Sequence, residues 1–388
     1  MGAVYGGATF CSWYPITPST SVAEGFEKYA SKYRVDPQTG KNNYISVQAE
    51  DELAAVGMAI GANWNGARGF TATSGPGISL MSEFLGLAYF AEVPLVIFNI
   101  QRGGPSTGMP TRTQQSDILS CAYASHGDTK HVLLFPEDPQ ECFEFSAEAF
   151  NLAERLQTPV FVISDLDIGM NDWVTDKFEW DDEQKYDRGK VLKAEDLDKM
   201  DNFGRYLDVD DDGICYRTYP GTHPEKGAFF TRGTSHDEYA RYTENGDINE
   251  QTLTRLVKKF RTASELVPDP IINLSEKQGS SGVIFYGSTS AAMYEAKDIL
   301  NENNIEVDLM RIRSFPFNLD VWEFIENHDL IYVIEQNRDS QMRTLIMAEG
   351  GISAEKLRSL VWFNGDPIQA KFIAKKIYER ESQQALIT

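Results

Sequence analysis

The sequence predicts an α/β protein built from parallel sheets that are covered by helices. Two observations support this fold class. In residues 1–172, short apolar runs alternate with segments of helical periodicity, and residues 281–388 return to the same alternation. Apolar strands joined by helices form parallel sheets that are buried on both faces. A chain of 388 residues is long enough for two or three domains with full cores.

Residues 1–172 form the first predicted domain. The expected strands are residues 8–13, 44–47, 69–73, 95–100, 132–135 and 160–164, and the main helices are residues 20–33, 53–62, 78–91 and 139–156. A doubly wound sheet binds its ligands at the carboxyl ends of its strands. The candidate functional residues are therefore those that follow a strand.

The segment from Gln48 to Gly77 has the most unusual composition. An acidic start of Glu50, Asp51 and Glu52 precedes a helix of alanines and glycines, a short strand and a Gly-Pro-Gly turn. Because each interior glycine costs a helix about 1 kcal/mol, so thin a helix indicates that another backbone or a flat ligand comes close. Two interpretations stay open for the carboxylates: they complement the helix dipole, or one is buried against a ligand.

Two loops that follow strands carry the other candidate residues. Residues 14–18, Tyr-Pro-Ile-Thr-Pro, are explained by local chemistry as a rigid loop that leads into a capped helix. Arg102 follows the strand at 95–100 and precedes a loop of glycines and hydroxyl residues, 103–108. Arginine suits bidentate capture of a carboxylate, and such a loop can approach an anion closely. No Gly-Lys-Ser/Thr follows, so a Walker nucleotide site is not expected.

These segments resemble the thiamine diphosphate enzymes. A glutamate nine residues before a glycine, in a small-residue helix followed by Thr-Ser-Gly-Pro-Gly, is similar to their pyrimidine-binding half-site, and Gly61 selects Glu52. The resemblance implies that Glu52 bonds the ring nitrogen of the aminopyrimidine and thereby activates the cofactor. It also implies a set of cofactor contacts, namely Pro15, Ile16, Thr17, Glu52, Ser74, Gly75 and Pro76.

The order YPITP, small-residue helix, TSGPG and RGGPSTG resembles the alpha subunit of the 2-oxoacid:ferredoxin oxidoreductases. RGGPSTGMPT is more similar to the 2-oxoglutarate branch than to the pyruvate branch. The family implies a 2-oxoacid oxidised to acyl-CoA and CO2, with electrons passed to ferredoxin. It implies catalytic roles for Glu52, Arg102 and Thr17, with Arg102 on the substrate's 1-carboxylate. For a second carboxylate, the nearest candidates in sequence are Ser106, Thr107 and Arg112.

The chain carries only half of such an active site. It lacks the Gly-Asp-Gly motif that binds magnesium in thiamine enzymes, and its four cysteines, taken as structural thiols, form no C-x-x-C pair. By resemblance, a beta subunit carries the diphosphate site, Mg2+ and an iron-sulfur cluster, a gamma subunit or domain is separate, and the assembly is a dimer of heterodimers. Two alternatives stay open: a half-site subunit of a non-redox thiamine decarboxylase or synthase, and a non-catalytic interaction subunit.

The remaining segments are expected to support this site. Residues 173–280 are predicted to be an irregular acidic connection, in which 208–213 is a solvated turn because Tyr219 stands where a calcium loop needs glutamate. Residues 281–388 resemble the transketolase C-terminal domain, with strands 282–287, 305–312 and 330–335 and helices 289–303 and 321–327. No metal site is expected, because the five histidines lack ligand spacing.

Charge and hydropathy limit the partners and the location. A net charge of −22 disfavours nucleic acid and anionic membranes and favours a basic protein partner. There is no run of about 18 apolar residues, and the first strand begins too early to leave room for a signal peptide. The expected location is the cytoplasm.

Overall fold

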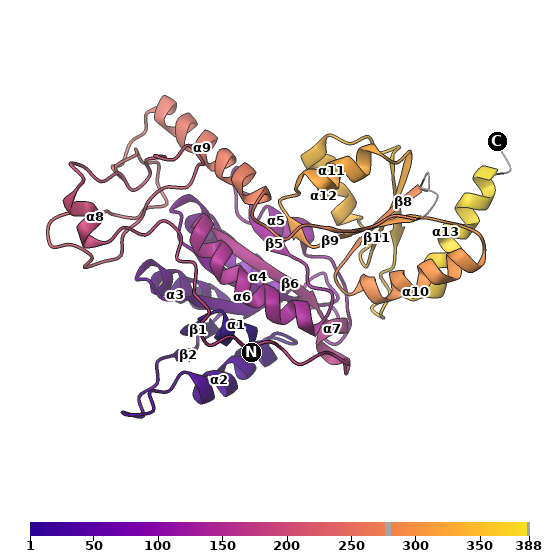
Figure 1. Cartoon of the computed structure of the whole chain (residues 1–388), viewed down its shortest axis with the longest axis horizontal. Helices are drawn as coiled ribbons and strands as arrows, with labels where there is room; N and C mark the ends of the chain where they lie inside the picture. The colour runs from indigo at the N-terminus through magenta and orange to yellow at the C-terminus, as the bar shows by residue number, and fades with distance from the viewer. Residues whose placement is uncertain (276–280, 386–388) are drawn as a thin grey trace.

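The structure is a computed structural model that describes residues 1–275 and 281–385. Residues 276–280, which end the predicted connection, and residues 386–388, which end the predicted C-terminal domain, lie outside the described residues. Figure 1 shows two α/β units side by side, the first coloured indigo to magenta and the second orange to yellow. The predicted α/β class is confirmed. No helix in the described residues is long and apolar enough to cross a membrane.

The first sheet has seven strands in the order β10-β5-β6-β4-β3-β1-β2. All six strands predicted for residues 1–172 are present: β1 (Phe10–Trp13), β2 (Ile45–Gln48), β3 (Gly69–Thr73), β4 (Leu95–Gln101), β5 (Val132–Leu134) and β6 (Pro159–Asp165). They pair in parallel. The seventh strand, β10 (Ser314–Phe315), comes from the C-terminal part of the chain and pairs antiparallel with β5.

Seven helices of the described chain belong to this first unit: α1 (Gly2–Tyr5), α2 (Thr20–Tyr33), α3 (Glu52–Trp64), α4 (Gly75–Phe90), α5 (Ile118–Ala122), α6 (Pro139–Leu156) and α7 (Leu166–Met170). The prediction of a turn at Gly-Pro-Gly is wrong, because these residues belong to a helix. Gly75 opens α4, and Pro76 lies in the first turn, where its missing N–H would have no intrahelical partner. The turn residues are therefore the positive end of a helix.

The segment predicted to be irregular, residues 173–280, is only partly so. It contains α8 (Ala194–Asp198), the 19-residue helix α9 (Gly246–Ser264) and β7 (Ile271–Asn273). Helix α9 is capped by Asn245, whose side chain accepts from two backbone amides. Leu256, Phe260 and Ala263 bury one face of α9, while its polar face accounts for the acidic, aperiodic appearance of the sequence.

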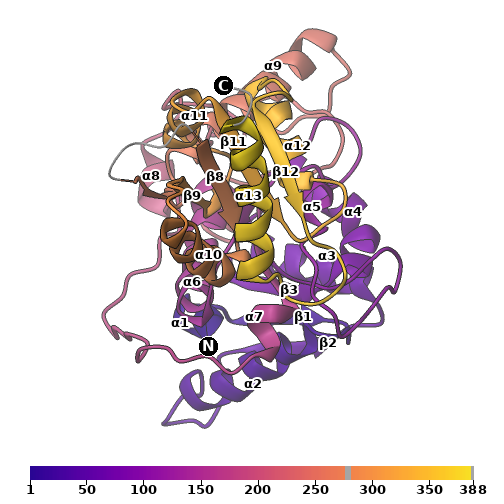
Figure 2. The same ribbon diagram turned by 90° about the vertical axis from the view of Figure 1, so that its right-hand side faces the viewer.

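The second sheet has the order β12-β11-β8-β9-β7, in which β7 alone is antiparallel. Its other strands are β8 (Ser281–Tyr286), β9 (Asp308–Ile312), β11 (Leu330–Glu335) and β12 (Leu357–Val361). Its helices are α10 (Thr289–Glu302), α11 (Leu319–Glu326), α12 (Gln341–Gly350) and α13 (Ala370–Ala385). Figure 2 looks onto α10 and α13, which cover one face. Residues of α11 and α12 pack on the other face, in the same core as the first sheet.

Buried polar side chains join the two units. Gln115 donates to the carbonyl of Tyr286 at 3.2 Å, and Ser288 donates to the carboxylate of Asp165 at 2.5 Å. Gln336 donates to the Ser288 hydroxyl at 2.9 Å. These contacts bring the loop that follows β11 to the carboxyl edge of the first sheet, where the predicted site lies.

Candidate active site

Four neighbouring strands of the first sheet deliver the predicted residues to one edge. In the order β4-β3-β1-β2, Arg102 follows β4, Ser74 follows β3, the YPITP loop follows β1 and Glu52 closely follows β2. Carboxyl ends of parallel strands meet at the same edge of a sheet. Segments from four distant parts of the chain are thereby brought to one edge.

The three acidic residues at the start of α3 have different environments. Asp51 is the N-cap, and its carboxylate accepts from the backbone amide of Ala54 at 2.6 Å. Glu50 is exposed, whereas Glu52 is only 5% exposed. A Cβ placed on Gly77 of α4 would lie 2.8 Å from Cγ of Glu52, so the glycine is needed for this close contact. Of the three carboxylates, Glu52 is the one enclosed in the protein.

The start of α4 presents a polar group without a partner. Ser74 occupies the N-cap position, yet it makes no side-chain cap bond, and its buried hydroxyl has no hydrogen-bond partner among the described residues. Such a group normally has a partner in a protein or its ligand. Gly75 and Pro76 follow it, half-buried. The arrangement fits residues that contact a polar cofactor.

Arg102 links two of the loops. Its guanidinium donates from Nη1 to the carbonyl of Thr17 at 2.7 Å and from Nη2 to the carbonyl of Thr107 at 3.0 Å. The side chain is buried, at 7% exposure, and its Nε has no partner among the described residues. Part of its donor capacity is therefore used by the backbone, and part is free for an anion.

A pocket of about 530 Å³ lies beside Arg102. Four of the predicted residues line it, namely Gly75, Pro76, Arg102 and Ser106. Pro15, Ile16, Thr17, Glu52, Ser74, Thr107 and Arg112 are not in its wall. The side chain of Arg112 is 57% exposed, with its Nε 4.0 Å from the carboxylate of Asp366. The pocket therefore extends from Arg102 along the start of α4, and Arg112 lies outside its wall, beside Gly365 and the wall residue Met109.

Sequence reasoning missed Asp117, which lies in the wall of the same pocket. Its carboxylate accepts from Nδ2 of Asn99 at 3.1 Å and would lie 3.0 Å from a Cβ on Gly75. Burial raises the pKa of Asp117 to about 6, although the Asn99 hydrogen bond and the charge of Arg102 lower it. The available signal was Asn99 itself, because a polar residue inside an apolar strand needs a buried partner.

The second unit also contributes to this pocket. Asn337, Arg338, Asp339 and Gln341, from the loop after β11 and the start of α12, lie in its wall. No pattern in the sequence places residues of the C-terminal unit near Arg102. Hydrogen bonds between the two units and the core that α12 shares with the first sheet place them there.

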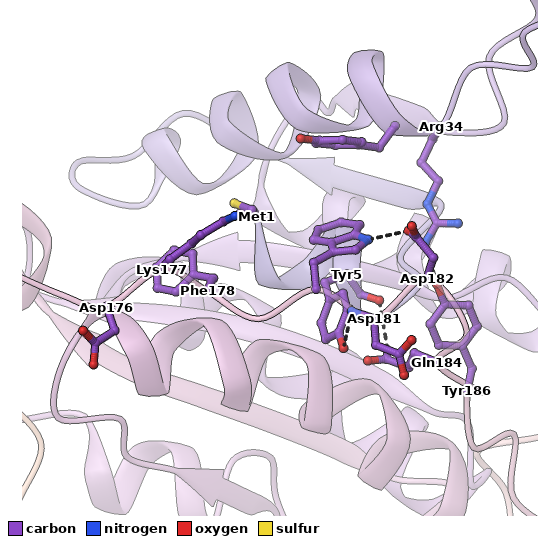
Figure 3. A pocket seen from close by; sticks show the side chains of 12 residues that line it. Met1, Tyr5, Arg34, Asp176, Lys177, Phe178, Asp181, Asp182, Gln184 and Tyr186 are labelled. Carbon is purple, nitrogen blue, oxygen red and sulfur yellow. Dashed lines mark hydrogen bonds between the residues drawn. The ribbon is translucent and has the colours of Figure 1, made fainter.

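A larger pocket of about 680 Å³ lies elsewhere (Figure 3). It is formed by α1, the end of α2 and the chain from 176 to 186. Tyr5, Tyr33 and Trp180 line it, and Arg34 donates to the hydroxyl of Tyr186 at 2.9 Å. It contains none of the predicted site residues, so size alone does not mark the candidate site.

The comparison with protein families agrees with the site at the strand ends. Residues 1–261 match the family model described as pyruvate flavodoxin/ferredoxin oxidoreductase, thiamine diphosphate-binding. The chain belongs to this family of enzyme subunits, and the predicted membership is confirmed.

Two individual relatives within this family are similar to the chain over most of its length. The chain is 36% identical over 377 residues to the alpha subunit of 2-oxoacid:ferredoxin oxidoreductase 1 of Sulfurisphaera tokodaii, an alignment that covers 95% of this chain and 58% of the relative. It is 35% identical over 347 residues to 2-oxoglutarate synthase subunit KorA of Methanothermobacter thermautotrophicus, covering 87% and 85%. The chain thus spans less than two thirds of the first of these relatives and most of the second.

Two solved structures have a similar fold. The 2-oxoglutarate:ferredoxin oxidoreductase from Magnetococcus marinus, with 2-oxoglutarate, coenzyme A and succinyl-CoA bound, superposes with a TM-score of 0.86 at 28% identity, over 97% of this chain and 63% of that one. A split-gene transketolase, an inactive beta4 tetramer, superposes with a TM-score of 0.51 at 9% identity, over 95% and 91%. The second likeness concerns the fold alone and agrees with the predicted transketolase-like architecture.

Proposed function

We propose that the chain is the alpha subunit of a thiamine diphosphate-dependent 2-oxoacid:ferredoxin oxidoreductase that acts on 2-oxoglutarate. The observation that carries the proposal is the buried carboxyl of Glu52, packed on Gly77 at the sheet edge that also holds Arg102. The reaction is oxidative decarboxylation to an acyl-CoA and CO2, with the electrons passed to ferredoxin. The printed names of the KorA relative and of the Magnetococcus structure support 2-oxoglutarate as the substrate.

The residues at the strand ends fit the cofactor's pyrimidine half. Glu52 would hold and exchange a proton at the pyrimidine ring nitrogen, and the unpartnered Ser74 hydroxyl is available to a polar ring atom. Pro15, Ile16, Thr17, Gly75 and Pro76 complete the proposed contact set. When bound, thiamine diphosphate supplies a carbanion for addition to the keto carbon. Arg102 would bind and orient the substrate's 1-carboxylate through the donors that its backbone bonds leave free.

Exposed apolar side chains on the outer face of α3 and α4 support the proposal of a partner subunit. Leu53, Met58 and Leu80 are at least 40% exposed there. A Cβ on Gly61 would meet nothing within 4 Å, so packing within the described chain does not explain this glycine. We propose that a beta subunit packs on this face and carries the diphosphate site, Mg2+ and the iron-sulfur cluster, with gamma separate and the whole a dimer of heterodimers.

The proposal is tested by Glu52→Gln in the chain assembled with its beta partner. Glutamine keeps the shape of the side chain but cannot exchange a proton at the ring nitrogen. We expect the rate of 2-oxoglutarate-dependent, coenzyme A-dependent ferredoxin reduction to fall roughly two to four orders of magnitude, the usual contribution of a positioned acid-base group. The thermal unfolding temperature of the variant should match that of the wild type.

Glu50→Gln is the matched control, because Glu50 is an exposed carboxylate two residues away. Its activity should stay at the wild-type level. A silent Glu52→Gln with a crippled Glu50→Gln would contradict the assignment of the half-site. Decarboxylation that needs no electron acceptor, with an iron-free partner, would instead indicate the non-redox alternative. An assembled complex that binds no thiamine diphosphate would indicate a non-catalytic subunit.

We also propose that the chain is organised in three parts, residues 1–172, 173–280 and 281–388. Two features support this division. The first sheet takes six of its seven strands from the first part, and the second sheet takes four of its five from the third. The middle part packs against the first through α9.

A further inference from the structure

The pocket beside Arg102 has cationic side chains from both units. Among the described residues that line it, Arg102 and Arg338 carry positive charge, and Asp117 and Asp339 carry negative charge. Arg102 follows β4 of the first sheet, and Arg338 follows β11 of the second. An anionic ligand with two charged ends could therefore be held by both units at once.

The backbone on each side of Arg338 is fixed by buried or half-buried side chains. Asn337, 1% exposed, donates to the carbonyl of Gln115 at 2.9 Å. Gln341 donates to the carbonyl of Ser116 at 2.6 Å and accepts from the backbone amide of Leu119 at 3.1 Å. Arg338 lies between these two attachments, so its position relative to the first unit is set by more than its own side chain.

The guanidinium of Arg338 has a weak partner. It donates to both carboxylate oxygens of the adjacent Asp339, from Nε to Oδ1 at 2.7 Å and from Nη2 to Oδ2 at 3.1 Å, but the two side chains are 72% and 62% exposed. Ion pairs so exposed contribute little to stability. A ligand carboxylate can therefore take the place of Asp339 at low cost.

Arg112 is differently placed. It is closer to Arg102 in sequence, but its side chain approaches Asp366 and the backbone of Gly365 rather than the pocket. Nearness in sequence therefore does not make Arg112 the better candidate for a second carboxylate.

We propose that Arg338 binds the distal carboxylate of a dicarboxylic 2-oxoacid whose 1-carboxylate is held by Arg102. The inference rests on the proposed function, and it assigns substrate selectivity to a residue of the C-terminal unit. Arg338 is a specificity residue in this proposal, since the bonds that change during the reaction lie at the other end of the substrate.

The test compares kcat/KM for 2-oxoglutarate and for pyruvate in the assembled enzyme. Charged hydrogen bonds contribute about 1.5–3 kcal/mol, so Arg338→Ala should lower kcat/KM for 2-oxoglutarate about ten- to a hundredfold. Pyruvate has no distal carboxylate, and its kcat/KM should change less than about twofold by the same argument. Arg338→Lys should recover part of the loss, because the charge remains.

Two further variants sharpen the comparison. Arg112→Ala removes an exposed arginine outside the pocket and should leave the ratio of the two kcat/KM values unchanged. Asp339→Asn removes the competing carboxylate and should raise kcat/KM for 2-oxoglutarate relative to pyruvate. An unchanged ratio in Arg338→Ala, or a loss confined to 2-oxoglutarate in Arg112→Ala, would overturn the inference. A wild-type enzyme that turns over neither substrate would overturn the proposed function instead, and the inference with it.

Discussion

Arg102 has a structural role in the chain in addition to the role proposed in catalysis. Its two terminal nitrogens donate to the carbonyls of Thr17 and Thr107 and so connect the loops after β1 and β4. A planar guanidinium can do this and still present a donor to a carboxylate, whereas the ammonium group of a lysine is a single point charge. This position therefore requires the planar shape of a guanidinium as well as its positive charge.

We therefore expect Arg102→Lys to be almost as damaging as Arg102→Ala. Losing one member of a buried charge pair costs about 2–5 kcal/mol in kcat/KM, or roughly thirty- to several-thousand-fold. Steady-state kinetics of the assembled enzyme measure this, with Arg112→Lys as the control in an exposed position. Wild-type kcat/KM in Arg102→Lys would show that charge alone suffices.

Asp117 makes the stability of the chain depend on pH. Its pKa is raised from 3.8 to about 6, so the folded protein binds this proton more tightly than the unfolded chain. The associated stability is fully present below pH 3.8 and is lost as the pH rises through about 6.

Asp117→Asn should remove this loss, because an amide stays neutral and can still accept from Asn99. At pH 8 the variant should be more stable than the wild type by about 1–3 kcal/mol, with little difference near pH 4. Urea unfolding of both proteins at several pH values measures this. A stability difference that does not change with pH would contradict the assignment.

At the residue scale, the resemblance to thiamine diphosphate enzymes singled out Glu52 and Arg102, and the structure shows that both are buried, while their roles in catalysis stay predictions. The sequence was not sufficient to single out Asp117 or Arg338. The pattern around Asp117 also fits a helix cap, and Arg338 resembles a solvent-exposed loop residue. Their positions depend on contacts between segments far apart in sequence.

At the scale of elements, α9 is attached to the first unit by a buried charge cluster. Glu92, 1% exposed at the end of α4, accepts from Nη2 of Arg255 at 2.5 Å and from Nζ of Lys259 at 2.9 Å. Burial alone would raise the pKa of Glu92, but the charges of Arg255 and Lys259 outweigh it and hold the pKa well below its usual range. The cluster is stabilising only while all its members are present.

Glu92→Gln should lower the free energy of unfolding by about 3–5 kcal/mol, because two buried cations lose their counter-charge. Since the folded-state pKa is lowered, the stability from Glu92 is present above pH 4.5 and is lost as the pH falls toward the folded value. Denaturant unfolding at pH 7 measures the loss. Glu379→Gln, which breaks exposed pairs with Lys375 and Lys376, is the control and should cost less than about 1 kcal/mol.

The helix α9 also shows where sequence reasoning about elements stops. The central strands of the first sheet, such as β4 and β6, are buried on both faces, so each reads as a nearly continuous apolar run in the sequence. Helix α9 buries one narrow face, which includes Lys259, and exposes the rest, so its composition resembles that of a loop. The partner of that lysine, Glu92, is far away in sequence, and no local pattern reveals the pair.

At the scale of the whole molecule, the outer face of α3 predicts an assembly. Gly61→Leu adds a side chain where this chain leaves open space, and leucine favours a helix over glycine. The thermal unfolding temperature of the isolated variant should therefore equal or exceed that of the wild type. Binding of the beta subunit should weaken because the added side chain keeps the two surfaces apart.

Gly25→Leu is the matched control, since Gly25 is also a helical glycine with nothing within 4 Å of its Cβ position, but lies on α2. Co-purification and size-exclusion chromatography of the two variants with the beta subunit distinguish them. Equal assembly by both variants would mean that the beta subunit does not use the α3 face.

The pairing of β10 with β5 has a consequence for biosynthesis. The ribosome completes β5 about 180 residues before it reaches β10, which at about 5–20 residues per second is a delay of roughly ten to forty seconds. During that interval the nascent chain presents an unpaired strand edge, which can pair with the edge of another chain. Chains released before residue 314 never close that edge, so the speed and completeness of translation influence how much of the protein escapes aggregation.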